Sequence, residues 1–178
     1  VILKIRPSNM LANILGAKMI IDSAISIIAV SILSVAILDI WQRLSHRVGG
    51  LPPTDWAIVG RWLRASIEQR KLFNHPLQAM PAYPNELLIG WMLHYLVGFF
   101  YVVLYVILWK TFGIRSPTWA DGLIFGVLSV AVPWFFFMPA MGAGIMGRKT
   151  PQPGTACLSV LAVHSVFGVA IGLLLRWI

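Results

Sequence analysis

Four long apolar stretches, separated by shorter polar ones, dominate the order of hydrophobic and polar positions along the chain. They cover about residues 19–41, 87–109, 120–138 and 156–177. Each has about 20 mostly apolar residues, the length that a helix needs to cross the hydrocarbon core of a bilayer. The pattern predicts an all-α protein: an integral membrane four-helix bundle in a single domain, residues 19–178. Residues 1–18 are interpreted as an N-terminal extension leading into the first span.

Residues 42–86 form the longest polar segment and contain a second pattern. Pro52-Pro53-Thr54 is typical of a helix start, with Thr54 as the predicted N-cap. Apolar residues then recur at helical spacing, at Trp56, Val59, Leu63 and Ile67. Charged residues fall largely on another face, at Arg61, Arg64, Glu68 and Lys71. This predicts an amphipathic helix in the membrane interface; the alternative is a polar connector helix packed on the bundle.

Composition and charge support the membrane class. Apolar residues make up 58% of the chain and charged residues 11%, against about 25% charged in average domains. The net charge is +8, but the basic residues are scattered over the loops, which is typical of lipid headgroup contact. We therefore predict the lipid bilayer as a partner and no nucleic acid. Basic residues number eight on the side of the long loop and six on the other, which favours a cytoplasmic long loop and external termini.

His94 and His164 lie at nearly the same depth in two predicted spans that run in the same direction. His94 is eight residues past Glu86 and His164 is nine residues past Thr155. At about 1.5 Å per residue, both lie about 12–14 Å from one membrane face. Polar side chains at that depth usually face a bundle interior. Small residues mark packing faces: Gly168 and Gly172 form a G-x-x-x-G motif in the fourth span. A face of the third span carries Gly122, Gly126, Ser129 and Pro133.

These two histidines are the leading candidates for a site that engages a small ligand, a metal or a proton. Their helices are diagonal neighbours in an up-down bundle, so space remains between the imidazoles. A haem or a quinone between them is an alternative, since His is a common axial ligand. The structural alternative is that each ring bonds a neighbouring helix and nothing more. Asp39 and Glu86 lie at the same membrane face, where each can orient an imidazole or pair with a basic loop residue.

The remaining candidates are weaker in chemical terms. Arg61, His75 and Tyr95 are secondary site residues. Met138 and Met141 are soft ligands suited to copper, although the lack of clustered methionines or a nearby cysteine favours core packing. No nucleophile elbow, P-loop, dinucleotide fingerprint or H-E-x-x-H motif occurs. The sequence therefore predicts neither an ordinary hydrolase nor a nucleotide-driven pump, and no catalytic residue is assigned.

A series of short motifs is shared, in order and spacing, with one family. The motifs include Asp39 in I-L-D-I-W, V-G-R-W at 59–62, F-N-H at 73–75, G-W-M-L-H-Y-L-V-G at 90–98, P-A-M-G-A-G at 139–144, T-P-Q-P at 150–153 and His164. Over residues 30–178 the chain resembles bacterial multi-pass membrane proteins of the domain-of-unknown-function family 2938. The resemblance implies Gln where this chain has Met138. It implies four spans and the bacterial inner membrane, and it names no ligand.

Three functions remain open at this stage. The first is binding or conduction of a small ligand, metal or proton at the polar cluster within the bundle. The second is a membrane redox subunit that holds haem or quinone between the two histidines. The third is a non-catalytic accessory subunit whose glycine faces pack against a membrane protein partner or a second copy of the chain.

Overall fold

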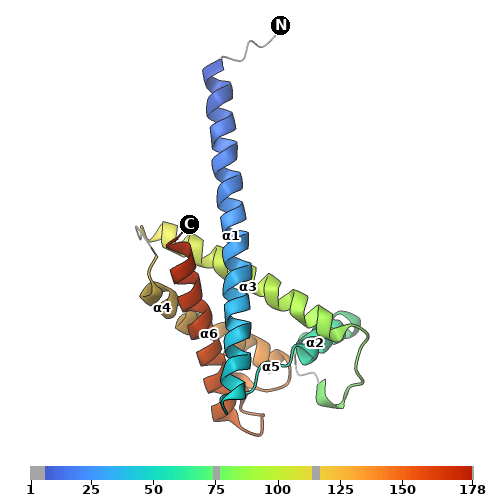
Figure 1. The fold of residues 1–178 in the computed structure, drawn as a ribbon. Helices are drawn as coiled ribbons and strands as arrows, with labels where there is room; N and C mark the ends of the chain where they lie inside the picture. Colours follow the sequence, from blue (N-terminus) through green and yellow to red (C-terminus); the bar gives the residue numbers. More distant parts are fainter. Residues whose placement is uncertain (1–6, 74–76, 114–116, 178) are drawn as a thin grey trace.

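A computed structural model describes residues 7–73, 77–113 and 117–177, without the side chains of residues 7–22 and Gln78. Within these residues, four helical segments are long and apolar enough to cross a membrane. They are residues 23–47 of α1 (Pro7–Arg47), α3 (Glu86–Thr111), residues 119–140 and α6 (Pro153–Leu175) (Figure 1). The predicted all-α, multi-pass membrane class is confirmed. His75 lies outside the described residues.

Large apolar side chains cover the outer surface of the spanning helices. Ile32, Phe100 and Leu128 are each about half or more exposed, at 51%, 59% and 70%. An apolar surface of this extent is typical of contact with lipid, whose hydrocarbon does not hydrogen bond. An α-helix satisfies its backbone groups internally, as a bilayer requires.

The third span is interrupted, whereas the sequence pattern predicts one apolar segment there. α4 (Trp119–Ser129) begins with a capping box between Thr118 and Asp121. It is followed by a π-helical turn, η2 (Pro133–Phe137), and by the short α5 (Met138–Ala140). Pro133 has no N–H, and its ring crowds the preceding turn, so the regular hydrogen-bond ladder cannot continue. Single π-turns of this kind are frequent at functional sites.

Glycines bring α4 and α6 into backbone contact. Gly122 and Gly126 face Gly168 and Gly172, and a Cβ added at Gly168 would meet the backbone oxygen of Gly122. The predicted packing role of these small residues is confirmed. Close approach here matters for the site, because Gly126 also meets the backbone oxygen of His164.

The helix of the long loop, α2 (Trp56–Gln69), packs on α3 by a second glycine contact. A Cβ at Gly60 would meet the backbone oxygen of Glu86, and one at Gly90 would meet that of Trp56. The predicted N-cap at Thr54 is wrong, because Asp55 accepts the Ala57 N–H and caps the helix. The backbone N–H and hydroxyl of Thr54 are instead directed to the Gln42 side chain, at 2.9 and 3.4 Å.

Because α2 packs on α3 through these glycines, the face of α2 that is buried differs from the apolar face predicted from the sequence. Its buried residues are Val59, Gly60, Trp62, Ala65 and Ser66. Ile67, which the pattern assigns to the apolar face, is 68% exposed. The helix is amphipathic as predicted, but glycine packing against α3 decides which side is buried.

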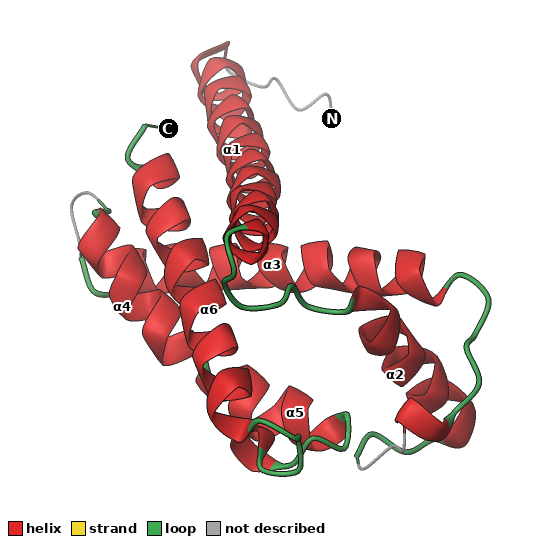
Figure 2. Cartoon of the chain, turned by 60° about the horizontal axis from the view of Figure 1, so that its bottom comes forward, coloured by secondary structure: helices red, strands yellow, loops and turns green. Residues whose placement is uncertain are grey.

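Two hydrophobic cores lie on either side of a central space. The larger core joins α1, α3, α4 and α6 through residues such as Val35, Val102, Phe125 and Ile171. The smaller core joins α2, η1 (Leu77–Ala79) and α5 around Trp62. A short loop with η3 (Ile145–Gly147) leads from α5 into α6. Figure 2 shows α1, α3, α2, α5 and α6 arranged around one central region.

Candidate functional site

A cavity of about 350 Å³ lies between the two cores, and both His94 and His164 line it. Its walls come from α1, the 52–54 segment, α2, α3, the η2–α5 turn and α6. Most of the lining is apolar, with Gln42, Thr54, Tyr101 and Ser159 as further polar groups. A mostly apolar cavity with a few polar groups is the usual form of a small-molecule site, although this volume is near the lower end of the range. The structure therefore brings together the two histidines that the sequence singles out.

The imidazole of His94 is held from two sides. Its Nε2 lies 3.1 Å from Oδ1 of Asp39, and both side chains are buried. The indole of Trp56 stacks on the other side of the ring, with centroids 3.8 Å apart and planes at 23°. Of the two carboxylates that the sequence offers to the histidines, Asp39 is thus the one that orients an imidazole. Such a carboxylate fixes the orientation of the ring.

Further contacts surround this pair on the α1–α3 side. The hydroxyl of Tyr95 is 3.5 Å from Oδ2 of Asp39. The Arg43 guanidinium donates to the backbone oxygen of Asp39 at 3.0 Å and lies over the Trp91 ring. Tyr95, a secondary candidate, therefore touches the carboxylate, whereas Arg43 binds the backbone and leaves both carboxylate oxygens to His94 and Tyr95.

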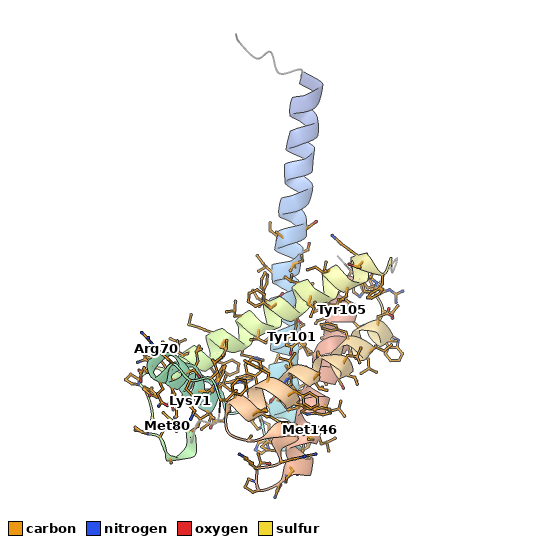
Figure 3. All side chains as sticks on the ribbon, turned by 180° about the vertical axis from the view of Figure 1, so that it is seen from behind. Arg70, Lys71, Met80, Tyr101, Tyr105 and Met146 are labelled. Carbon is orange, nitrogen blue, oxygen red and sulfur yellow. The ribbon has the colours of Figure 1, made fainter. Side chains whose placement is uncertain are left out.

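His164 is anchored by a different partner. Its Nδ1 lies 2.7 Å from Oγ of Ser129 on α4. The Ser129 hydroxyl also donates to the backbone oxygen of Gly126 at 2.7 Å. Tyr101 from α3 contacts the ring edge to face, at 5.6 Å and 90°, and donates to the Ser129 backbone oxygen at 3.4 Å. Tyr101 and Tyr105 follow one another along α3 (Figure 3).

Glu86 belongs to a separate cluster with Arg61. Two nitrogens of the Arg61 guanidinium bind the two Glu86 oxygens at 2.8 and 2.9 Å. The third nitrogen donates to the backbone oxygens of Leu77 and Met80. Hydrogen bonds to Glu86 raise the pKa of Arg61 above its ordinary value. Glu86 therefore pairs with a basic residue of the long loop, the second of the two roles predicted for it. The Arg61–Glu86 cluster connects the 77–86 segment to α2 and does not line the cavity.

We expect Arg61→Gln to loosen that segment. The shorter, neutral side chain cannot bind both carboxylate oxygens, and the carbonyls of Leu77 and Met80 lose their donor. Amide hydrogen exchange should become at least several-fold faster over residues 77–86 and stay unchanged in α6. Arg148→Gln, at an exposed position in another loop, is the control. Equal exchange in both variants would contradict the assigned role of Arg61.

Several cavity residues lie outside the short sequence motifs. Tyr101 lies seven residues after His94, so helical periodicity places both on one face of α3. Gln42 is three residues after Asp39 on α1 and shares its face in the same way. Ser129 was recognised only as a small packing residue. Its bond to His164 depends on the close approach of α4 and α6, which sequence periodicity alone does not specify.

The structure also places the weaker candidates. Met138 and Met141 both line the cavity, beside the π-helical turn. No group of three or more His, Cys, Asp or Glu side chains that can hold a metal occurs among the described residues. Metal, haem and quinone binding, and the accessory-subunit role, stay predictions.

Comparison with known proteins yields one family. Residues 28–176 match the family described as "Protein of unknown function (DUF2938)". This confirms the resemblance carried by the short motifs of the sequence. No curated protein and no solved structure matches the chain.

Proposed function

We propose that this chain, which belongs to the DUF2938 family, binds a small, mainly apolar molecule in its central cavity and links that binding to a proton on an imidazole. The observation that carries the proposal is the placement of His94 and His164 in the wall of one cavity. Each ring uses one nitrogen in a hydrogen bond to the protein. Within the described part of the chain, the other nitrogen of each ring has no partner, so it is available to an occupant.

Proton linkage follows from the chemistry of His94. Imidazole is the side chain that most readily changes charge near neutral pH. The buried Asp39 carboxylate lies 3.1 Å away and fixes the orientation of the ring. An occupant that gives a proton to His94 therefore leaves an imidazolium–carboxylate pair rather than an isolated buried charge.

The proposed location is the bacterial inner membrane, with the long first loop on the cytoplasmic side. The greater number of basic residues on that side supports this orientation. An alkaline phosphatase fused after residue 178 should then be active, and a fluorescent protein fused there should stay dark. The reverse pattern would overturn the orientation.

A cavity-filling variant tests ligand binding. Val163 lines the cavity from α6, so Val163→Trp should occupy much of its space. The probe is 4-fluorophenol, observed by fluorine NMR with the protein in lipid nanodiscs. We expect saturable binding to the native protein and at least tenfold weaker binding to Val163→Trp.

The matched control is Leu158→Trp on the same helix. Leu158 is 55% exposed and does not line the cavity, so the same indole there should leave binding unchanged. Because the lipid takes up part of any apolar probe, the comparison between variants, rather than total uptake, carries the result. Equal binding to the native protein and to a folded Val163→Trp variant would overturn the proposal.

A further inference from the structure

Resting on the proposed function, we infer that the cavity selects an aromatic molecule carrying two hydroxyl donors, a diphenol or quinol. The selection comes from the protonation pattern that the protein imposes on the two imidazoles. A neutral imidazole has one donor nitrogen and one acceptor nitrogen, and the partner of the first determines the role of the second.

Asp39 determines which nitrogen of His94 can accept a hydrogen bond. An ionised carboxylate only accepts hydrogen bonds, so Nε2 of His94, 3.1 Å from Oδ1, carries the proton and donates. Tyr95 donates to the second carboxylate oxygen, which agrees with an acceptor role for both oxygens. Nδ1 is then the unprotonated nitrogen, and it has no partner among the described residues.

His164 carries its proton on the other nitrogen, Nδ1, and it too is left with one nitrogen that can only accept a hydrogen bond. The single proton of the Ser129 hydroxyl goes to the backbone oxygen of Gly126, which accepts only. Nδ1 of His164 must therefore donate to Ser129 Oγ, and Nε2 keeps its lone pair. In the part of the chain that the structure describes, this Nε2 has no partner either. The two rings thus offer two acceptors and no donor.

The rest of the cavity lining is suited to a ligand with a flat, apolar ring system between these two acceptor nitrogens. Aromatic rings of Trp56, Tyr101, Phe137 and Phe167 line the cavity. Two of the other polar groups already have partners: the Gln42 amide oxygen accepts from Thr54, and the Tyr101 hydroxyl donates to the backbone oxygen of Ser129. A ligand whose donors meet both histidines leaves no buried acceptor unpaired, whereas a molecule of the same shape without donors does.

The test compares isosteric ligands that differ only in their donors. The probes are 4,4′-dihydroxybiphenyl against 4,4′-dimethylbiphenyl and, for a shorter span, 1,4-dihydroxybenzene against 1,4-dimethylbenzene. Binding is measured by equilibrium dialysis of the nanodisc-embedded protein without oxygen, with Val163→Trp subtracted as the lipid background. At least one diol should bind about tenfold or more tightly than its dimethyl partner, because it makes two extra hydrogen bonds.

Substitutions of the two histidines test whether their imidazoles cause the preference for the diol over the dimethyl compound. His94→Phe and His164→Phe should each reduce the preference for the diol about threefold or more, while affinity for the dimethyl compound stays within about twofold. If either histidine has a purely structural role, its replacement by Phe should weaken the binding of both compounds equally. That result would overturn the assignment. If the diol and dimethyl compounds bind equally well and Val163→Trp blocks both, the inference fails and the proposed function stands. If no compound shows binding that Val163→Trp blocks, both fail.

Discussion

Gly168→Ala is expected to destabilise the protein by about 1–3 kcal/mol, the usual cost of overpacking a tightly packed interior. An added Cβ would meet the backbone oxygen of Gly122 and lie 2.8 Å from Cα of Gly126. These are backbone atoms, so no side-chain rotation relieves the clash, and α4 must move away from α6. The same movement separates Ser129 from His164, whose bond crosses this contact.

Gly154→Ala is the matched control for this substitution. Gly154 lies in the same helix, and a Cβ there meets no atom within 4 Å. Alanine favours helix over glycine by about 1 kcal/mol, so this variant should be as stable as the native protein or slightly more so. Unfolding by sodium dodecyl sulfate in mixed micelles measures both variants. Equal stability of the two would contradict backbone contact between α4 and α6.

Gly168→Ala should also affect the cavity. If α4 withdraws, His164 loses the partner that fixes its tautomer, and its ring is free to present a donor instead of an acceptor. Preference for a diol over its dimethyl isostere should then fall together with stability. In Gly154→Ala that preference should remain.

The parts of the structure that were predictable are those that depend on local pattern. Span length and the small-residue faces are repeated signals, so the four spans and the packing role of Gly122 and Gly168 follow from sequence. The depth of His94 and His164 follows from the helix rise, and both indeed line one cavity. Depth does not specify lateral neighbours, however. The sequence therefore leaves open which carboxylate, Asp39 or Glu86, forms a hydrogen bond to a histidine.

The features that escaped prediction depend on packing between distant segments. Trp56 reads as one apolar position of an amphipathic helix, yet it stacks on His94 because Gly60 and Gly90 bring α2 against α3. The same contact buries Trp62 and exposes Ile67. Pro133 was assigned only to a packing face of an unbroken third span, and the apolar pattern does not show that the chain forms a π-turn there and continues.

A double-mutant cycle on Asp39 and His94 should show strong coupling. His94→Phe keeps a ring that can stack on Trp56 but removes Nε2. Among the described residues, the buried Asp39 carboxylate then keeps only the long contact to Tyr95. Breaking a buried pair by removing one partner costs about 3–5 kcal/mol. We therefore expect His94→Phe to unfold at markedly lower denaturant than the native protein.

The other two variants complete the cycle. Asp39→Leu leaves the neutral imidazole with an unsatisfied donor, which costs about 1–3 kcal/mol. The double variant has neither the buried charge nor the orphaned donor, so it should be more stable than His94→Phe alone. The coupling should reach about 1–3 kcal/mol, the upper part of the range for residues in one network. Arg43 cannot replace His94 in this cycle, because it binds the backbone oxygen of Asp39 and not the carboxylate. Additive losses in the double variant would mean that the 3.1 Å contact contributes nothing beyond packing, and the basis for proton linkage at His94 would be lost with it.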